Sequence, residues 1–577
     1  RPWYERCAAY EFSVLPCLTD LVPAWSPADW KLIEADLCKM LSFITVRPPL
    51  PLPDGAFVSL TVPDVARLVP DLASVSVGAD AMELRVEYVR RQLGVLRRHS
   101  DLPIIFTVRT KAQGGRFPDD RQREHAALLE KGLEWGCEYV DAEITLPDGA
   151  LRRLSERRGN ARIIASWHDL AGVARRSGEV VKRAAKFGDI VKMVGTVRTL
   201  VDNFPVRESA REEGGAVESF MEGKPAIVIN MGAEGQLSRC LNRFLTPATH
   251  PALPTKAAPG QLSVAEINTA RHLIGLLPAR KYFLFGCPIA QSPSPALHNA
   301  GFRALALPHV YALYETGDAA NLEPVMRSAE FGGASVTIPH KVDVAGMMDS
   351  VSPAARAIGA VNTVVAVDGP GGRTLLFGDN TDWLGIHDCV ARKVGGDLAA
   401  LRGEDGLVIG AGGTARAAVY ALKELGLRTV RIWNRTYAKA ADVARELGAE
   451  AAESLALLAA PAVVVATVPA EAQEPIREAL RGLFERAAAG AGGARQDGET
   501  TLAARVAVEM AYRPTYTPFA LAASNKGYSL ETGLGVLVAQ GLRQFEIWTG
   551  KRPPAETMIF VSTTTLPFRV LLAFAPV

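Results

Sequence analysis

A lysine and a histidine lie in two apolar segments of this chain, and together their side chains could activate a ketone. Lys192 belongs to the apolar run 189–195, and His168 ends the run 162–168. An amine attacks a ketone to form an imine. An imidazole titrates near neutral pH, so it can remove and return a proton at the carbon next to the imine. Each residue alone is more often a snorkelling surface lysine or a satisfied core histidine. At the C-terminal ends of two successive strands, they predict a Schiff-base lysine with a general acid/base beside it, suited to dehydrating a β-hydroxy ketone.

Further charged residues recur at the ends of other apolar runs. Glu83 and Arg85 close one run, Arg109 closes the next, and Arg239 follows a later one. A planar guanidinium can hold a carboxylate through two hydrogen bonds, so these arginines predict a substrate that carries a carboxylate. We also expect burial and the neighbouring cations to favour the unprotonated, reactive amine of Lys192.

The charged residues lie in or just after eight apolar runs, which are separated by segments of helix length. A strand and a helix repeated eight times are typical of a (β/α)8 barrel, whose active site lies at the C-terminal ends of the strands. Such a barrel would bring the charged residues to one face. The runs begin at residues 57, 81, 103, 139, 162, 189, 225 and 243.

A second set of residues, in the α/β pattern that begins near Lys281, could reduce a ketone. Lys341 follows one apolar run, and Asp382 closes the segment 378–382. Each alone is more often a solvated loop charge. As a pair beside a cofactor cleft, they could protonate the alkoxide that forms when a ketone receives a hydride.

A glycine-rich turn predicts the cofactor site. It follows a strand that begins near Gly406 and opens a helix, which places a dinucleotide pyrophosphate at the helix N-terminus. At the end of the next strand, Arg435 suits the 2′-phosphate of NADP, where NAD enzymes usually carry an acid. NADP is therefore predicted rather than NAD. The predicted cofactor-binding residues are Gly410, Ala411, Gly412, Gly413, Thr414, Ala415, Asn434, Arg435 and Thr436.

Composition argues against several other classes of protein. The net charge of +2 comes from 64 basic and 62 acidic residues without a basic, aromatic patch, so nucleic-acid binding has no support. The seven cysteines stand singly, which predicts a reduced, cytoplasmic chain without a metal site. We find no signal peptide and no apolar run long enough to cross a membrane. Small-molecule substrates are expected, and the sequence leaves open whether the chain forms a homodimer.

Six segments of the first half resemble type I 3-dehydroquinate dehydratases. They are ELRVE, IIFTVRT, IIASWHD, DIVKMVG, NMGAEGQLSR and KAAPGQLS, within residues 57–275. The resemblance implies that Lys192 forms the imine and that His168 is the general acid/base. It also implies that the substrate is oriented by Glu83, Arg85, Arg109, Arg239 and Gln261. Gln113 replaces a common glutamate, so tuning of the imidazole by that charge is expected to be lost, and Ala257 replaces a common serine.

Segments of the second half resemble shikimate dehydrogenases over residues 281–554. In the family's order they are PIAQSPSPALHN, SVTIPHK, GAVNTV, GDNTDW, GAGGTAR, WNRT and GLGVLVAQG. The resemblance implies that Lys341 and Asp382 are the catalytic pair. It also implies substrate binding by Ser292, Ser294, Thr337, Asn362, Tyr512 and Gln540. Gln291 stands where a histidine is common, and Trp383 where a glycine is common.

Together the resemblances imply two consecutive reactions of the shikimate pathway to chorismate and the aromatic amino acids. Dehydration of 3-dehydroquinate gives 3-dehydroshikimate, and reduction with NADPH gives shikimate. The order of the segments resembles the C-terminal part of the fungal pentafunctional AROM polypeptides.

Two alternatives use the same folds. The chain also resembles the fungal quinate-pathway transcriptional repressors, which would use these folds as ligand sensors. Retention of His168, Lys192, Arg239, Lys341 and Asp382 favours an enzyme. In the second alternative, the barrel is catalytic and the other domain only senses a ligand. The intact glycine turn argues against this alternative.

The expected fold class is α/β, with a TIM barrel followed by a two-part shikimate dehydrogenase unit. Residues 1–50 are expected to be a kinase-like remnant and linker, and the first residue, Arg1, suggests a fragment. A surface loop is expected over residues 487–500. The remaining expected bounds are 51–278 for the barrel, 279–390 for the substrate-binding domain, 391–555 for the Rossmann domain with helices returning to the substrate domain, and 556–577 for an unassigned tail.

Overall fold

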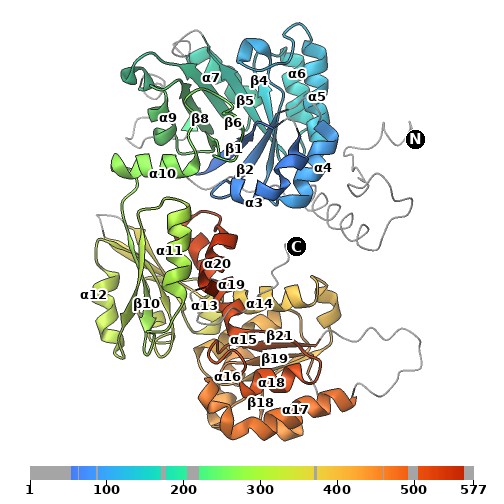
Figure 1. Cartoon of the computed structure of the whole chain (residues 1–577), viewed down its shortest axis with the longest axis vertical. Helices are drawn as coiled ribbons and strands as arrows, with labels where there is room; N and C mark the ends of the chain where they lie inside the picture. Colours follow the sequence, from blue (N-terminus) through green and yellow to red (C-terminus); the bar gives the residue numbers. More distant parts are fainter. Residues whose placement is uncertain are drawn as a thin grey trace, which may run out of the picture. The chain divides into compact units, whose positions relative to one another are not determined.

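The computed structural model describes residues 54–62, 64–85, 89–170, 177–204, 220–221, 223–369, 373–458, 461–490 and 505–564. The chain divides near residue 278 into two compact units (Figure 1). The expected kinase-like remnant lies outside the described residues. Helix α17 (Arg477–Gly490) continues past the expected start of the surface loop, and α20 (Ala555–Thr564) occupies the first part of the unassigned tail.

Eight parallel strands form a nearly closed barrel in the first unit. Most of their side chains are buried and many are β-branched or aromatic, as parallel strands covered on both faces require. Each strand lies beside the next one in the barrel, in the order β8-β6-β5-β4-β3-β2-β1-β9. The strands are β1 (Ala56–Leu60), β2 (Ala81–Arg85), β3 (Ile104–Thr107), β4 (Tyr139–Glu143), β5 (Arg162–His168), β6 (Ile190–Thr196), β8 (Lys224–Met231) and β9 (Thr246–Ala248), while β7 (Phe220–Met221) pairs antiparallel with β8. The predicted barrel is confirmed.

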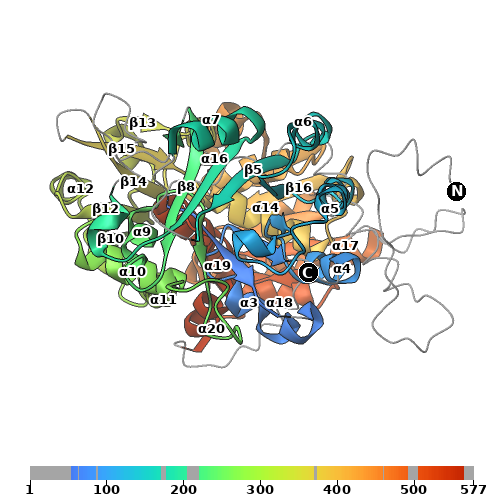
Figure 2. The ribbon, with the colours of Figure 1, turned by 90° about the horizontal axis from the view of Figure 1, so that it is seen from above.

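Amphipathic helices surround these strands, as Figure 2 shows for α4 to α7. Helix α5, for example, buries Ala126, Leu129 and Leu133 at helical spacing and leaves charged residues outside. A capping box starts α10, where the side chains of Ser263 and Glu266 each accept a hydrogen bond from the other's backbone N–H. The helices are α3 (Leu72–Val75), α4 (Val89–His99), α5 (Gln122–Glu134), α6 (Asp148–Arg157), α7 (Ser177–Phe187), α9 (Gln236–Leu241) and α10 (Val264–Leu273).

The second unit contains two six-stranded sheets, of which the first is mixed. Its order is β11-β10-β12-β14-β15-β13, and β14 runs antiparallel to both of its neighbours. The strands are β10 (Lys281–Gly286), β11 (Val310–Glu315), β12 (Phe331–Val336), β13 (Ser350–Val351), β14 (Thr363–Asp368) and β15 (Thr374–Asp379). The helices in this part are α11 (Ser294–Ala304), α12 (Leu322–Met326) and α13 (Pro353–Ile358).

Helix α19 (Gly533–Thr549) returns from the end of the unit to this mixed sheet. Trp548 donates a hydrogen bond from Nε1 to the Val364 carbonyl at 2.9 Å, and its ring packs on Tyr282 at 5.1 Å. Phe545 packs on Phe302 of α11 at 5.3 Å. These aromatic contacts fix α19 against β12 and β14, so that its polar residues can join a site on the sheet.

The second sheet is entirely parallel, in the order β18-β17-β16-β19-β20-β21. This is the doubly wound order of a Rossmann fold, whose direction reverses between β16 and β19, and a ligand is expected at the C-terminal ends of those strands. The strands are β16 (Asp405–Ile409), β17 (Thr429–Trp433), β18 (Glu450–Ala452), β19 (Val463–Ala466), β20 (Val506–Glu509) and β21 (Ser529–Glu531). Helices α14 (Asp382–Lys393), α15 (Gly413–Glu424) and α16 (Tyr437–Leu447) pack on one face, and α17 and α18 (Pro518–Ser524) on the other (Figure 1). The predicted fold class is confirmed.

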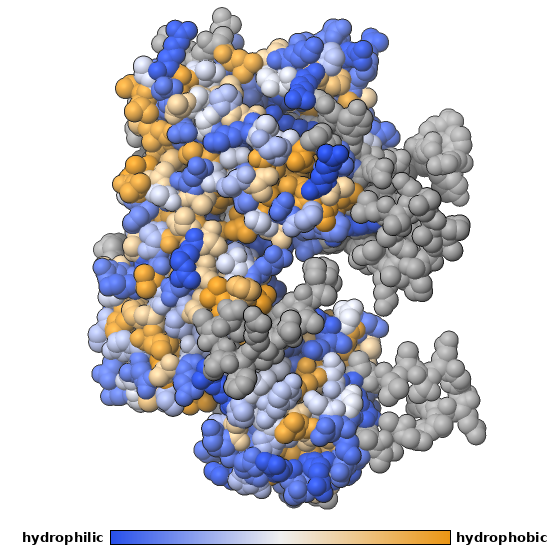
Figure 3. Space-filling view, in the orientation of Figure 1, coloured by the Kyte–Doolittle hydropathy of each residue, from blue (hydrophilic) through white to orange (hydrophobic). Residues whose placement is uncertain are grey.

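No helix in the described ranges is long and apolar enough to cross a membrane, and no group of three or more His, Cys, Asp or Glu side chains in them could hold a metal ion. On the face drawn in Figure 3, hydrophilic and hydrophobic residues are interspersed over both units.

Candidate functional site

Three charged side chains form one layer inside the barrel. Glu83, Asp141 and Lys192 are each the third residue of their strand, on the second, fourth and sixth strands of the barrel. In a closed barrel, inward-pointing residues of alternate strands lie at the same height. The layer explains why residues so far apart in the sequence meet, and all three are at most 3% exposed.

Lys192 is held by carboxylates. Its Nζ donates to Asp141 Oδ2 at 2.7 Å and lies 3.8 Å from Glu83 Oε1. One expectation was wrong, because Lys192 lies inside β6 rather than at its C-terminal end. A neighbouring cation is present as expected, since the guanidinium of Arg109 contacts the same Asp141 oxygen at 2.7 Å.

Arg109 adds a second positive charge beside the buried carboxylate of Asp141. Its guanidinium pairs with Asp141 at 2.7 Å, donates to Ser166 Oγ at 2.8 Å and approaches Glu143 at 3.5 Å. Burial would raise the pKa of Asp141, but the charges of Arg109 and Lys192 outweigh it and hold that pKa well below its ordinary value. Asp141 therefore stays ionised and acts as a fixed anchor for the amine.

Glu83 is an ionised carboxylate at neutral pH. Burial would raise its pKa, yet the charges of Arg85 and Lys192 lower it to about 2. Thr107 donates a hydrogen bond to Glu83 Oε1 at 2.9 Å from the neighbouring strand. Arg85 lies 3.5 Å from the other carboxylate oxygen and is partly exposed, so its guanidinium can reach a ligand.

His168 ends β5, directly beside β6. Ser166 pairs in register with Lys192, and His168 follows two residues later on the same face, so its imidazole and the amine both point into the barrel. Burial, followed by the charges of Arg109 and Lys192, holds the pKa of His168 well below its ordinary value. Its Nδ1 has no hydrogen-bond partner among the described residues. The imidazole is thus neutral and has a free nitrogen.

Gln113 contacts the backbone of His168 rather than its ring. The backbone N–H of His168 donates to Gln113 Oε1 at 2.6 Å. This agrees with the expectation that no charge of residue 113 tunes the imidazole. Gln113 instead holds the end of β5 in place.

Arg239 is buried completely on α9 and only partly satisfied. One guanidinium nitrogen, Nη1, donates to the Pro247 carbonyl at 3.0 Å, while Nε and Nη2 have no hydrogen-bond partner in the described part of the chain. Burial lowers its pKa to about 10, so it remains a cation. A buried cation with free N–H groups is ready to bind an anion. Gln261, also buried, donates to the Ala248 carbonyl at 2.8 Å and accepts from the Ala257 backbone at 2.9 Å.

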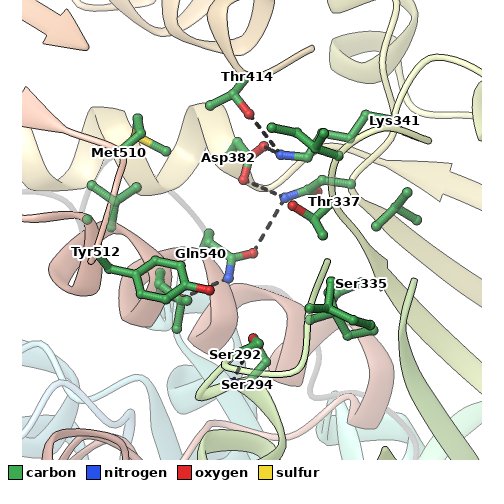
Figure 4. A pocket seen from close by; sticks show the side chains of 18 of the residues that line it. Ser292, Ser294, Ser335, Thr337, Lys341, Asp382, Thr414, Met510, Tyr512 and Gln540 are labelled. Carbon is green, nitrogen blue, oxygen red and sulfur yellow. Dashed lines mark hydrogen bonds and ion pairs between the residues drawn. The ribbon is translucent and has the colours of Figure 1, made fainter. Parts of the chain in front are cut away.

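The second unit has a cavity of about 290 Å³ between its two sheets. It collects every residue that was predicted to bind substrate or to react in this unit. Figure 4 shows many of them around this space. The predicted residues that line it are Ser292, Ser294, Thr337, Lys341, Asn362, Asp382, Tyr512 and Gln540, together with Thr414 of the glycine turn.

Lys341 and Asp382 form a buried ion pair on one side of the cavity (Figure 4). Lys341 Nζ lies 2.5 Å from Asp382 Oδ2 and also donates to Thr414 Oγ1 at 3.0 Å. Asp382 is the first residue of α14, where the helix dipole favours a negative charge. The amine therefore has one fixed acid partner and can present its remaining N–H to a ligand.

Asn362 orients Asp382. Its Oδ1 accepts from the backbone N–H of Thr381 at 2.7 Å, so its amide nitrogen faces Asp382 Oδ1 at 2.9 Å. Gln540 Oε1, from α19, lies 3.2 Å from the Thr381 hydroxyl. Asn362 and Lys341 thus hold the Asp382 carboxylate directly, and Gln540 supports the adjacent Thr381.

A serine pair lies apart from Lys341 in the cavity (Figure 4). Ser292 donates a hydrogen bond to Ser294 Oγ at 3.1 Å. Tyr512, after β20, also faces the cavity, and burial raises the pKa of its hydroxyl. Ser294 and Tyr512 can each donate to a ligand while Ser292 supports Ser294, so this side of the cavity suits a carboxylate.

The glycine turn fits a dinucleotide. Gly410 has a φ of 121°, and a Cβ there would meet Thr467 Oγ1 at 2.3 Å, so only glycine can make this turn after β16. A Cβ on Gly412 would meet nothing within 4 Å, which leaves open space in front of the N-terminus of α15. Arg435, past the end of β17, is exposed, and no ion pair links it to the described residues. These features suit a pyrophosphate and a 2′-phosphate.

The two unusual residues of this unit have structural partners. Trp383 packs against Tyr420 at 5.2 Å, between α14 and α15. Gln291 accepts a hydrogen bond from Arg513 at 2.7 Å. Neither belongs to the residues that line the cavity.

Several site residues were missed by the sequence analysis. Asp141 and Glu143 interrupt a buried strand, and this alternation of charge within an apolar run could have revealed them. Ser335 and Gln544 line the cavity of the second unit and carry no such signal, because each is an ordinary polar residue at a strand or helix position.

Comparisons with protein families agree with this architecture. Residues 56–278 match the type I 3-dehydroquinase model. In the second unit, residues 284–364 match the shikimate dehydrogenase substrate binding domain, 390–476 match shikimate / quinate 5-dehydrogenase, and 533–559 match the shikimate 5'-dehydrogenase C-terminal domain.

Individual proteins are similar over one or both units. A pentafunctional AROM polypeptide of Malassezia globosa is 42% identical over 541 residues, which cover 89% of this chain and 32% of that protein. The chain thus spans about a third of the length of this curated relative. A shikimate 5-dehydrogenase from Thermus thermophilus, solved with NADP(H) and shikimate, is 32% identical and covers 49% of this chain and 98% of its own, with a TM-score of 0.39.

The solved dehydroquinate dehydratase and shikimate dehydrogenase from S. pombe AroM is similar over nearly its whole length. It is 36% identical, covers 91% of this chain and 99% of its own, and superposes with a TM-score of 0.70. The fold and these matches show that the chain belongs to the family in which a type I 3-dehydroquinase is joined to a shikimate dehydrogenase, as in the AROM polypeptides.

Proposed function

We propose that this chain dehydrates 3-dehydroquinate to 3-dehydroshikimate in the barrel and reduces 3-dehydroshikimate to shikimate with NADPH in the second unit. The observation that carries the proposal is the presence of a complete catalytic set in each unit. The barrel holds Lys192 beside neutral His168, and the cavity holds the Lys341–Asp382 pair. A repressor that only senses ligands would need neither set. The corresponding domains are proposed to be 51–278, 279–390 and 391–555.

In the barrel, the amine of Lys192 attacks the ketone carbon, and water leaves as the imine forms. His168 removes a proton from the carbon next to the imine, which gives an enamine. The enamine expels the β-hydroxyl group, and His168 returns its proton so that water departs. Hydrolysis of the imine then releases the enone and restores Lys192. Asp141 stays ionised throughout and stabilises the cationic imine.

The substrate of the barrel is proposed to be held by its carboxylate and hydroxyl groups. Arg239 has free N–H groups for the carboxylate. Glu83 is an ionised acceptor for a hydroxyl. Arg85, Arg109 and Gln261 are proposed to complete the binding site.

In the second unit, the Lys341–Asp382 pair is proposed to move the proton. A bound NADPH supplies the hydride. As the ketone becomes an alkoxide, Lys341 donates a proton to the oxygen, and Asp382 keeps the lysine in place. Ser292, Ser294 and Tyr512 are proposed to hold the carboxylate, and Thr337, Asn362 and Gln540 the ring hydroxyls.

NADP is proposed over NAD because of Arg435, which carries a positive charge where a ribose-binding acid would stand. Gly410, Ala411, Gly412, Gly413, Thr414 and Ala415 are proposed to surround the pyrophosphate, with Asn434 and Thr436 beside Arg435. Initial rates of shikimate oxidation with each cofactor test the proposal. We expect absorbance to rise with NADP and far more slowly with NAD. No change with either cofactor, in folded protein, would refute the reductase.

Dehydration should persist in mildly acidic solution. His168 must be unprotonated to accept a proton, and its pKa lies well below the ordinary 6.5. As the pH falls through 6.5, the imidazole stays neutral, so kcat/KM should remain flat there and decline only well below it. Formation of the conjugated enone, followed by absorbance from about pH 5 to pH 8, measures this profile. A loss of half the activity near pH 6.5 would contradict the depressed pKa.

Arg239→Met should weaken substrate binding and stabilise the fold. Loss of charged hydrogen bonds to a carboxylate should raise the KM for dehydroquinate by roughly 10- to 100-fold. Methionine keeps the apolar stem and removes a buried cation, so the free energy of unfolding should rise by about 1–3 kcal/mol. Kinetics and urea denaturation measure the two effects.

Arg243→Met is the matched control, because Arg243 is exposed and pairs with Asp54 at 3.2 Å on the surface. It should change the KM and the free energy of unfolding little. An unchanged KM in Arg239→Met would rule out the proposed role.

A further inference from the structure

Glu509 is a buried carboxylate that the proposed reactions do not use. It ends β20, just before Met510, Ala511 and Tyr512, which line the cavity of the second unit, and Figure 4 draws Met510 and Tyr512 on the same side of it. We propose that Glu509 is a positioning residue for the nicotinamide end of the cofactor, because it ties the loop after β20 to the loop after β19. The inference rests on the proposed reductase function and adds which residue holds the cofactor in place.

Two loops form one wall of the cavity. Residues 467–469 follow β19 and residues 510–512 follow β20, and all six line the cavity. In a doubly wound sheet, a dinucleotide lies across the C-terminal ends of the strands, with its two halves on opposite sides of the glycine turn. Arg435, proposed for the 2′-phosphate, follows β17 on one side of β16, and β19 and β20 lie on the other side. The nicotinamide half is therefore expected beside these two loops, which we call the cofactor wall.

Glu509 joins the two loops through Gln473. The Nε2 of Gln473 donates to Glu509 Oε2 at 2.9 Å and to the Val468 carbonyl at 3.3 Å. The other carboxylate oxygen, Oε1, accepts from the Ala511 backbone N–H at 2.8 Å. Glu509 and Gln473 are completely buried, so water does not compete for these bonds. One carboxyl group thus connects Val468 in the first loop with Ala511 in the second.

The direction of the Gln473 amide is fixed from its other end. Gln473 Oε1 accepts from the Phe519 backbone N–H at 3.1 Å, so its nitrogen must face Glu509. Glu509 therefore meets a backbone N–H at one oxygen and an amide N–H at the other. A carboxyl group can accept at both oxygens, whereas a glutamine in the same place would set its own NH2 against one of these donors. The position requires a carboxyl group and not only its shape.

These bonds do not depend on the charge of Glu509. Burial raises the pKa of Glu509 above its ordinary value, and hydrogen-bond donors such as Thr517 oppose this shift. The hydroxyl of Thr517 contacts Glu509 Oε2, and it can donate to the ionised form or accept from the protonated form. Thr517 also caps α18, where its oxygen accepts from the Ala520 N–H at 3.1 Å. Protonation alone therefore leaves the connection between the loops intact.

A fixed cofactor wall matters because Lys341 and Asp382 line the same cavity. A cofactor held in this cavity must lie at a set distance from the ketone that Lys341 protonates, since small displacements cost rate. Without the connection through Glu509, binding would have to order both loops, which lowers affinity. The adenosine half is expected on the other side of the glycine turn, so its affinity should not change.

Glu509→Gln separates this role from simple packing, because it keeps the size of the side chain. The purified full chain is titrated in a calorimeter with NADP and with 2′-phospho-ADP-ribose, a fragment that lacks the nicotinamide. Glu509→Gln should raise the Kd for NADP by roughly 3- to 30-fold and that for the fragment by less than about twofold. Gln473→Met, which removes the amide at similar length, should have the same selective effect.

Glu474→Gln is the matched control, because Glu474 follows Gln473 directly, is exposed and pairs with Arg477 at 2.7 Å on the surface. It should leave both dissociation constants unchanged. An unchanged Kd for NADP in both Glu509→Gln and Gln473→Met would overturn the proposal. Equal losses of affinity for NADP and for the fragment in both variants would also overturn it, because they would indicate a general loss of structure. Failure of the unsubstituted protein to bind NADP would instead refute the proposed reductase function.

Discussion

Replacing Lys192 by alanine should abolish dehydration of 3-dehydroquinate and leave the oxidation of shikimate unchanged. Without the amine no imine can form, so kcat should fall by at least on the order of 10⁴-fold, as when a covalent nucleophile is removed. The second unit holds its own ion pair and needs nothing from Lys192. Separate assays of the two reactions on one preparation compare the loss of dehydration with the retained oxidation of shikimate.

Trapping identifies the covalent step directly. Borohydride added with dehydroquinate should reduce the imine and leave a stable adduct, which peptide mass spectrometry should place on Lys192. Lys186→Ala is a matched control, because Lys186 lies on α7 with its side chain 60% exposed. The control should be labelled like the unsubstituted protein and Lys192→Ala should not. An adduct on another lysine would refute the assignment.

Replacing Lys341 by methionine should impair the reduction of 3-dehydroshikimate and leave the dehydration of 3-dehydroquinate intact. Reduction of 3-dehydroshikimate should fall by roughly 10²- to 10⁴-fold, because the alkoxide loses its proton donor. Asp382 would keep Asn362 as a partner at 2.9 Å, so the cavity should persist. Dehydration should be unaffected. Initial rates with NADPH, and binding of shikimate measured independently, separate chemistry from affinity.

Lys281→Met serves as the control for this variant, because Lys281 is exposed and pairs with Glu330 on the surface. It should retain full activity. If Lys341→Met kept more than about a tenth of the normal rate, another group would have to supply the proton.

The barrel could be predicted from sequence because each strand is a short, buried apolar run. The positions of His168 at the end of β5 and of Arg109 just after β3 follow directly from that pattern. The depth of Lys192 did not follow, because an apolar run shows where a strand lies and not which of its residues share a layer with other strands. That layer depends on strand register, which brought Asp141 to Lys192 across 51 positions of sequence.

The cofactor turn could also be predicted, because a strand, a glycine turn and a helix are adjacent in the chain. Gly410 carries its own signal, since its φ of 121° strongly favours glycine. The contact of Ser335 with Gln544 joins residues 209 positions apart and depends on α19 packing against the mixed sheet through Trp548. No local pattern encodes such a contact, so this part of the site required the structure.

Conversion of 3-dehydroquinate to shikimate by the chain alone distinguishes the proposed bifunctional enzyme from a ligand sensor. The purified chain is given 3-dehydroquinate and NADPH, and the loss of NADPH and the formation of shikimate are followed together. We expect one NADPH to be consumed for each shikimate formed. Lys192→Ala should stop the reaction before any NADPH is used, and Lys341→Met should let 3-dehydroshikimate accumulate. If folded protein consumed no NADPH from either 3-dehydroquinate or 3-dehydroshikimate, the chain would not be the proposed bifunctional enzyme.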